Sequence, residues 1–218
     1  MSDINLNINV EVEKREISWI YILSKRIIDI AGSLVGLLLS SPILIIVGML
    51  IKLESKGEIV FSQRRVGKNG KEFKMYKLRS MVVNAEEIKG KLKEQNEMSG
   101  PMFKMKDDPR ITKIGKFIRK ISIDELPQLV NVLKGEMSLV GPRPSLPNEV
   151  KEFETWMLTR LDVKPGLTCY WQVMGRNNID FEEWMKLDVK YVNERSFWLD
   201  IKLILKTFFV LFGDKNAR

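Results

Sequence analysis

Residues 30–51, IAGSLVGLLLSSPILIIVGMLI, contain no charged side chain and are the most apolar stretch of the chain. At 1.5 Å of rise per residue, a helix of this length would cross a hydrocarbon core of about 30 Å. The stretch lies too far inside the chain for a cleaved signal peptide. A buried core helix is the alternative, and the length and hydrophobicity of the stretch disfavour it. We therefore expect a membrane helix.

Two features favour a helix that enters and leaves the membrane on the same side. Ser41 and Pro42 lie in the middle of the stretch, where proline removes a helix hydrogen bond and disfavours helix at the preceding residue. Both flanks are basic, and positive charge marks the cytoplasmic side. The flanking basic residues are Lys25, Arg26, Lys52, Lys56, Arg64, Arg65 and Lys68. A re-entrant helix-break-helix over residues 25–55 satisfies both flanks, and a Pro-kinked spanning helix is the alternative.

Composition narrows the chemistry that the chain can carry out. Its 218 residues suggest a single domain, and its net charge of +8 favours anionic partners. There is no histidine, which excludes Ser-His-Asp and Cys-His catalysis and imidazole metal sites. Cys169 is the only cysteine, which excludes an internal disulfide and a Cys-rich zinc site. Catalysis would need carboxylates, lysine, tyrosine, hydroxyls or an oxygen-bound metal.

A β-hairpin is predicted after the membrane segment. Strand-like runs at 59–63 and 72–78 flank the turn signal Asn69-Gly70. Between Lys56 and Arg79 there are eight basic and two acidic residues. This charge could form a solvated face, or it could attract anionic headgroups or a phosphorylated substrate. At the other end of the chain, residues 1–24 are expected to form a weakly structured, mildly acidic arm.

Two helices are predicted between the hairpin and the middle of the chain. Residues 82–97 indicate a polar helix without chemistry. Residues 111–121 form a short, basic amphipathic helix, which would lie either in the core or in the membrane interface. The pair Asp107-Asp108 could bind a hard cation, but before a proline it is far more typical of a turn.

A second acidic pair, Asp124-Glu125, stands at a predicted helix start. Ser122 and Glu125 have the spacing of a capping box, although Pro127 would then fall inside the helix. If Asp124 is the cap, Pro127 falls harmlessly in the first turn. Two adjacent carboxylates at this place could instead supply a nucleophile and a Mg²⁺ ligand. The residues alone favour capping over catalysis.

An ordered set of motifs resembles the bacterial sugar transferase family, the monotopic phosphoglycosyl transferases that start polysaccharide and glycoconjugate assembly. The similarity runs from about Lys25 to Phe212. Its segments are KRIIDIAG, SSP, FSQRRVGKNGKEFKMYKLRSM, RKISIDELPQLVNVLKGEMSLVGPRP, VKPGLTCYWQVMGRN and LDVKYVNERSFWLDIKLILKT. One departure is Cys169, where the family usually has glycine, and this puts the local turn geometry in question.

The resemblance implies transfer of a sugar-1-phosphate from a nucleotide sugar, usually a UDP-sugar, to a polyprenyl phosphate, usually undecaprenyl phosphate, with release of UMP. It implies that Asp124 is the nucleophile and carries the phosphosugar covalently. The acidic pair, chiefly Glu125, would hold Mg²⁺, with Mn²⁺ as an alternative. Ser41-Pro42 would make the re-entrant helix that penetrates one leaflet.

Cations are expected near Asp124, because two phosphate-bearing substrates must meet there. The candidates are Arg119, Arg143 and Arg176, each of which could otherwise form a surface or structural ion pair. Asp200 falls on the apolar face of the helix predicted over 197–212, where a carboxylate is costly unless it is paired or functional. A buried ion pair to an arginine is one interpretation. The family match places Asp200 in the active site, and Asp188 is a similar candidate.

We therefore expect a helix-dominated α+β fold, with a re-entrant helix, interfacial amphipathic helices and a small sheet or hairpin. Residues 56–218 would form a monotopic catalytic domain on the cytoplasmic face of the bacterial inner membrane. The expected partners are a nucleotide sugar, polyprenyl phosphate and anionic lipids. Nucleic acid is not expected, because aromatic-basic stacking motifs are absent. A basic scaffold without catalysis and a UDP-releasing glycosyltransferase are the alternatives; the sugar and a homo-oligomer are left open.

Overall fold

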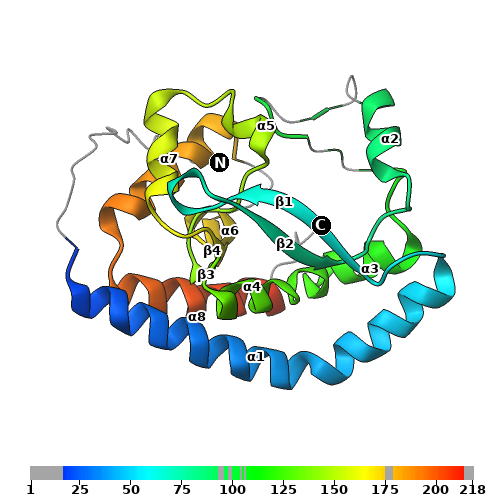
Figure 1. Cartoon of the computed structure of the whole chain (residues 1–218), viewed down its shortest axis with the longest axis horizontal. Coiled ribbons are helices and arrows are strands. Elements are labelled where there is room, and N and C mark those ends of the chain that lie inside the picture. The colour runs from blue at the N-terminus through cyan, green and yellow to red at the C-terminus, as the bar shows by residue number, and fades with distance from the viewer. Residues whose placement is uncertain are drawn as a thin grey trace.

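One long helix, α1 (Trp19–Glu54), forms the base of the molecule in the computed structural model (Figure 1). The structure describes residues 17–92, 96–97, 100–103, 105, 107–174 and 179–213. The helix starts after Ser18, whose hydroxyl accepts a hydrogen bond from the amide of Ile20. Residues 19–24, predicted as part of a weakly structured arm, are therefore helical, and residues 1–16 lie outside the described chain.

The predicted break at Ser41-Pro42 is a bend within one continuous helix. Figure 1 shows α1 curving near its middle, and Pro42 lies inside the helix. Because proline has no N–H, the carbonyl of Leu38 loses its helix partner. The Ser41 hydroxyl donates to that same carbonyl at 2.8 Å. The serine thus satisfies the oxygen that its proline neighbour leaves free, which suits an apolar surrounding.

The predicted hairpin is confirmed. Strands β1 (Val60–Val66) and β2 (Glu72–Leu78) pair antiparallel, with Gln63 opposite Met75. The connection at Lys68–Gly70 has positive φ at Asn69 and Gly70, a conformation that asparagine and glycine tolerate best. The buried side chain of Met75 packs with Val132 and Met137, so the hairpin covers one side of the domain interior.

The remaining elements are short, apart from two helices near the C-terminus. They are α2 (Ala85–Lys91), α3 (Lys113–Lys120), η3 (Ile123–Glu125), α4 (Gln128–Lys134), β3 (Ser138–Val140), α5 (Pro147–Val150), η4 (Thr155–Asp162), β4 (Gly166–Thr168), α6 (Tyr170–Met174), α7 (Phe181–Glu194) and α8 (Phe197–Gly213). The helix predicted over 82–97 is thus confined to α2 among the described residues. The helix-dominated fold with small sheets is confirmed.

Strands β3 and β4 pair in parallel and bring distant segments into close contact. A Cβ on Gly166 would lie 2.2 Å from the amide nitrogen of Gly141, and a Cβ on Gly141 would lie 2.4 Å from the carbonyl oxygen of Lys164. Neither glycine can therefore carry a side chain. This crossing fixes the start of the Gly141–Pro144 segment.

Cys169 and the Asp107-Asp108 pair have structural explanations. Cys169 is fully buried in a cluster with Tyr191 and Leu203, so its thiol fills space in the core. Asp108 accepts a hydrogen bond from the backbone amide of Arg110 at 3.0 Å, which confirms turn chemistry, and it also pairs with the Arg110 guanidinium at 2.6 Å. Among the described residues, no three His, Cys, Asp or Glu side chains are grouped as a metal site.

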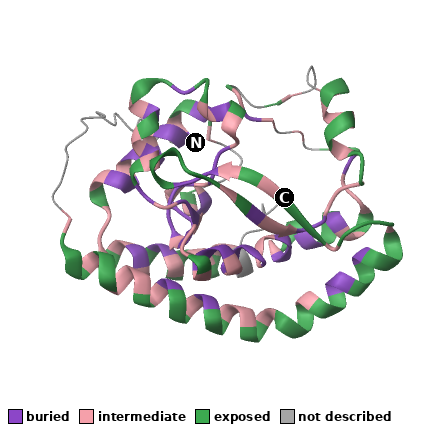
Figure 2. Cartoon of the chain, viewed as in Figure 1, coloured by how far each residue is buried: buried purple, intermediate pink, exposed green. Residues whose placement is uncertain are grey.

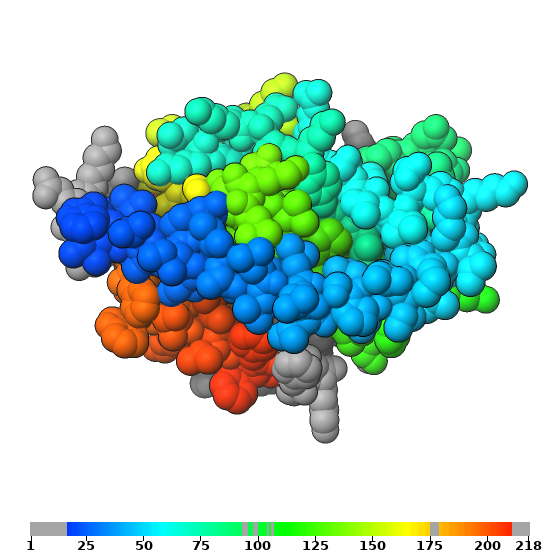
Figure 3. Space-filling model, turned by 60° about the horizontal axis from the view of Figure 1, so that its bottom comes forward, coloured from blue at the N-terminus to red at the C-terminus, as the bar shows by residue number. Residues whose placement is uncertain are grey.

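An apolar surface lies along the base of the molecule. Figure 2 shows exposed residues along the outer side of α1, and Figure 3 shows α1 crossing the base with α8 beside it. In the described chain, α1 is the one helix long and apolar enough to cross a membrane. The α3 side chains divide: Ile118 is fully buried, while Phe117 is exposed. The core interpretation therefore holds for Ile118, and the interface interpretation stays a prediction for the exposed Phe117.

Candidate functional site

The pair Asp124-Glu125 lies in the turn η3, between α3 and α4. Ser122 has φ of 56° and makes no capping hydrogen bond, so the predicted capping box is wrong. Pro127 immediately precedes α4, which begins without a side-chain cap, so Asp124 is not a cap either. Helix capping therefore does not account for the acidic pair.

Glu125 is held by two cations from different parts of the fold. Lys77 of β2 donates to its Oε1 at 2.7 Å, and Arg143 reaches the same oxygen at 3.4 Å. Burial lowers the pKa of Lys77, while the Glu125 carboxylate opposes that shift. Arg143 therefore occupies the place beside the acidic pair that the sequence predicted for it.

Asp124 is buried and yet unbonded. Its residue exposure is 6%, and no described residue forms a hydrogen bond or ion pair with its carboxylate. Burial raises the pKa of Asp124, and Glu125 raises it further, whereas the charges of Lys77, Arg119 and Arg143 lower it. A carboxylate oxygen without a hydrogen-bond partner keeps its lone pairs available to attack an electrophile.

A small cleft adjoins Glu125 and is rich in cations. It is lined by Arg65, Met75, Lys77, Glu125, Gln128, Arg143, Pro144, Gly166, Leu167 and Gln172. Burial, with the nearby charge of Arg143, lowers the pKa of Arg65 to about 10. Three cationic side chains face one carboxylate at this cleft. Such an excess of positive charge suits a diphosphate or another strongly anionic ligand.

Sequence reasoning missed Lys77 and Arg65 as individual site residues. The alternation of side chains along the two strands could have shown that Lys77 and Arg65 lie on the same face of the hairpin. Phe61 pairs with Lys77 and Arg65 with Phe73, so these side chains share one face of the two strands. The basic hairpin was noted, but its sequence alone does not say which face meets the acidic pair.

The other predicted site residues do not contact the acidic pair in the described structure. Arg119 is exposed on α3, and its charge reaches Asp124 only as a pKa-lowering influence. Arg176 lies outside the described residues. Asp200 pairs with Lys25 at 2.8 Å and accepts a hydrogen bond from Tyr191 at 2.8 Å, so it ties α8 to α1. The expected ion pair is present, with a lysine where an arginine was predicted.

Asp188 reaches the site only through Arg160. The two residues form a buried ion pair at 2.6 Å. Arg160 also donates to the carbonyl of Arg143 at 2.7 Å and to the hydroxyl of Ser145. Asp188 therefore fixes the segment that carries Arg143 toward Glu125. Its own carboxylate is already paired.

The acidic pair fits a divalent metal that a substrate helps to hold. Mg²⁺ is commonly bound by one or two carboxylates together with phosphate oxygens. Asp124 and Glu125 supply two adjacent carboxylates, and no third acidic side chain joins them in the described chain. The donor set therefore suits a metal completed by phosphate, and not an all-protein cage.

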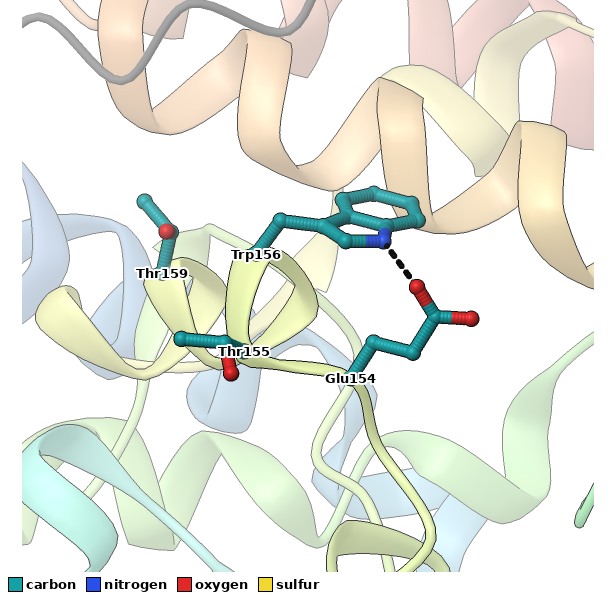
Figure 4. Close-up of a pocket in the computed structure, with 4 residues that line it drawn as sticks. All are labelled: Glu154, Thr155, Trp156 and Thr159. Atoms are coloured by element: carbon teal, nitrogen blue, oxygen red, sulfur yellow. Dashed lines mark hydrogen bonds between the residues drawn. The ribbon is translucent and has the colours of Figure 1, made fainter.

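A separate open depression lies along η4 (Figure 4). It is lined by Glu154, Thr155, Trp156 and Thr159, and the Trp156 indole donates to Glu154 at 2.9 Å. None of the predicted site residues lines it. Its one carboxylate is hydrogen-bonded to the Trp156 indole, and no described cation lines the depression.

Comparison with known proteins matches most of the chain. A family model described as "Bacterial sugar transferase" matches residues 20–214. The chain is 54% identical over 199 residues to the galactosyl transferase CpsE of Streptococcus agalactiae, covering 91% of this chain and 44% of that protein. It is 42% identical over 187 residues to an undecaprenyl-phosphate galactose phosphotransferase of Salmonella typhimurium, covering 84% and 39% respectively.

A third relative acts on a different sugar by its name. It is a UDP-N-acetylgalactosamine-undecaprenyl-phosphate N-acetylgalactosaminephosphotransferase of Aeromonas hydrophila, 38% identical over 205 residues, covering 91% of this chain and 46% of that protein. The chain spans less than half the length of these three curated relatives.

Proposed function

Because the chain belongs to the bacterial sugar transferase family, we propose that it transfers a sugar-1-phosphate from a UDP-sugar to a polyprenyl phosphate and releases UMP. The names of the relatives support undecaprenyl phosphate as the acceptor. These names include galactose and N-acetylgalactosamine, so they do not identify the sugar that this chain transfers. The observation that carries the mechanism is Asp124, a buried carboxylate that bonds to no described residue and lies beside a cluster of cations.

Asp124 acts as the nucleophile in this proposal. One carboxylate oxygen attacks the phosphorus that bears the sugar, an oxygen–phosphorus bond forms, and the bond to the UMP oxygen breaks. UMP leaves with the bonding electrons. A phosphate oxygen of the lipid then attacks the same phosphorus and releases Asp124, which forms the lipid diphosphate sugar. No histidine is needed, because carboxylate and phosphate oxygens attack as anions and require no imidazole base.

The cations around the cleft hold the donor. Lys77, Arg65 and Arg143 converge on one cleft, and together they neutralise the diphosphate and orient the scissile bond. Glu125, with Asp124, would hold Mg²⁺, and Mn²⁺ would serve in its place. A bound metal would supply further charge neutralisation at the phosphates. Arg160 keeps Arg143 in position through its backbone carbonyl.

The apolar base lies in the cytoplasmic leaflet of the inner membrane in this proposal. The exposed apolar side chains of α1 reach the acyl region, and α3 and α8 lie at the interface. The bend at Pro42 returns α1 to the side from which it came. The basic hairpin would add attraction to anionic lipids. This placement presents the acidic pair to a lipid phosphate at the headgroup level.

Intact-mass analysis with a UDP-sugar and Mg²⁺, but without lipid acceptor, tests the nucleophile. The parent should gain the mass of one sugar phosphate on the peptide that contains Asp124 and should release UMP. Asp124→Asn keeps the size of the side chain and should show no adduct, with turnover reduced by several orders of magnitude. Glu58→Gln, an exposed carboxylate remote in sequence, is the matched control. Release of UDP would indicate a glycosyltransferase, and UMP release only with lipid present would defeat the covalent step.

Topology is tested by cysteine labelling in intact cells. Single cysteines at Ser18 and Lys56, both exposed and on opposite sides of the apolar stretch, should both resist an impermeant external thiol reagent. The buried thiol of Cys169 can remain in place, because it is inaccessible. Labelling of one position alone would establish a spanning helix.

A further inference from the structure

The acidic pair lies between two helices that are held by opposite halves of α1. We call residues 19–41 the first limb of α1 and residues 43–54 its second limb, with Pro42 between them. Figure 1 shows α4 above the first limb and α3 above the second, and α1 contacts both helices. Only residues 121–127 join α3 to α4, and Asp124 and Glu125 are among them.

The first limb grips α4 at its carboxyl end. Arg26 donates to the carbonyls of Val132 and Leu133, each at 2.7 Å. These are among the last carbonyls of α4; that of Val132 also accepts from the amide of Gly135, the residue after the helix, at 2.9 Å. Along the interface, a Cβ on Gly36 would lie 2.9 Å from a methyl carbon of Leu129. The first limb and α4 are therefore joined by close packing and by a charged cap.

The first limb also holds the strand that follows α4. Asp29 accepts hydrogen bonds from the amide of Leu139 at 2.8 Å and from the hydroxyl of Ser138 at 2.9 Å. Lys25 donates to the carbonyl of Val140 at 2.9 Å. This strand leads directly into the segment that carries Arg143. One limb thus positions both α4 and the cation beside Glu125.

The second limb grips α3 at its amino end. The Glu54 carboxylate accepts hydrogen bonds from the amides of Lys113 at 2.8 Å and Ile114 at 3.2 Å. These amides are free in the first turn of α3, and the negative charge suits the helix dipole there. Val47 and Ile51 share a buried cluster with Ile118 of α3 and Ile123 of η3. The second limb therefore moves with α3 and with the residue next to Asp124.

From these contacts we propose that the bend of α1 sets the geometry of the Asp124–Glu125 turn, with Arg26 and Glu54 as positioning residues at its two ends. A change in the angle between the limbs must change the separation of α3 and α4, because each limb is fixed to one of them. The turn between them takes up the difference. Helices respond to bilayer thickness by tilting or kinking. A change in the thickness of the surrounding lipid would therefore change the bend of α1, and with it the geometry of the Asp124–Glu125 turn.

Distance measurement between spin labels tests the mechanical part without any catalysis. Cysteines at Lys116 on α3 and Lys134 on α4, both exposed, carry the labels, and the buried Cys169 stays unmodified. The protein is placed in vesicles of phosphatidylcholine and phosphatidylglycerol with either dimyristoyl or dioleoyl chains. The α3–α4 distance should differ between the two bilayers in the parent. Glu54→Ala should reduce that difference, because α3 is released from the second limb.

Matched variants keep this test falsifiable. Glu58→Ala removes an exposed carboxylate just beyond α1 and should keep the full bilayer response. Glu54→Gln retains an acceptor oxygen and should give an intermediate response, which also serves if the alanine variant does not fold. The same distance in both bilayers, or a full response in Glu54→Ala, would overturn the proposal.

Turnover in the two bilayers tests whether the motion reaches the acidic pair. This part rests on the proposed function, whereas the label distances rest only on the placement of α1 in lipid. In the parent, kcat should differ several-fold between the two bilayers while the KM for the UDP-sugar stays unchanged. In Glu54→Ala, kcat should lose most of this dependence on the bilayer. A variant whose kcat depends on the bilayer as fully as that of the parent would overturn the positioning role of Glu54.

Discussion

Asp124 and Asp188 are both buried carboxylates, but they stand in opposite relations to their surroundings. Asp188 is fully buried and forms an ion pair with Arg160 at 2.6 Å. Asp124 is almost as buried, and no described residue bonds to it. Burial raises the pKa of both, that of Asp188 to about 6 in spite of its partner. Burial alone therefore does not separate a structural carboxylate from a reactive one.

The difference lies in what happens when each group is removed. Removing one member of a buried ion pair leaves the other charge buried without a counter-charge, which is strongly unfavourable. An unpaired buried carboxylate leaves nothing stranded, and its neutral replacement is easier to bury. Replacing Asp188 should therefore mainly lower the stability of the fold, whereas replacing Asp124 should mainly lower the activity.

The largest effect on stability is expected for Asp188→Ala. Removing the carboxylate leaves the Arg160 guanidinium buried without a counter-charge, so unfolding by urea in detergent should show a loss of about 3–5 kcal/mol. Asp188→Asn keeps an acceptor for Arg160 and should lose less. If alanine costs no more than asparagine, the ion pair does not hold the Arg143 segment, and the contrast with Asp124 fails.

Lys77→Gln should come next, and its effect should be on activity. Loss of a positioned cation from the diphosphate site should lower kcat/KM by about 10²–10³-fold. Because the pKa of Lys77 is lowered by burial, the parent should also lose activity on the alkaline side at a lower pH than an ordinary lysine would give. The glutamine variant should lack that alkaline limb. A variant that keeps the limb would assign it to another group.

Asp124→Asn should stabilise the fold, by about 0.5–2 kcal/mol at pH 8. A carboxyl whose pKa is raised by folding contributes stability below its unfolded pKa, and that contribution is lost as pH rises through the folded pKa. The amide cannot ionise, so its advantage should be greatest at high pH and should vanish at low pH. Thermal unfolding of both proteins from pH 4 to pH 8 measures this. A destabilised variant at pH 8 would mean that the ionised Asp124 has a partner.

The smallest effect is expected for Glu72→Gln, which breaks an exposed pair with Arg64 at 3.6 Å. Solvent and side-chain entropy leave such a pair worth about 0–1 kcal/mol. The midpoint of urea unfolding should stay close to that of the parent. A loss comparable to that of Asp188→Ala would show that ion pairs in this domain cannot be ranked by burial.

Local sequence signals predicted the local structure well. Asn69-Gly70 located the hairpin turn, and the apolar run located α1, because both depend on near neighbours in the chain. Ser122 and Glu125 failed as a capping box because Ser122 adopts a left-handed conformation and makes no capping hydrogen bond. An N-cap residue normally has an extended backbone, so correct spacing alone did not make a cap.

The site was only partly accessible to sequence reasoning. Arg143 was one of the three cations expected near Asp124, and Asp124 itself was identified through the family resemblance. Lys77 and Asp200 depend on pairings across the fold, with Glu125 and Lys25 respectively. No local pattern specifies such partners, because the residues meet only when the hairpin and α8 have packed.

The charged cap that joins α1 to α4 has a consequence for the order of events during synthesis. Arg26 and its carbonyl partner in Val132 are 106 residues apart, and Lys25 and Asp200 are 175 apart. At about 5–20 residues per second, the first limb of α1 would leave the ribosome many seconds before α4 exists. Until then, Lys25, Arg26 and Asp29 would find hydrogen-bond partners only in water and lipid headgroups. The nascent helix would therefore sit shallower in the lipid than the finished protein, and would sink only when the rest of the chain arrives.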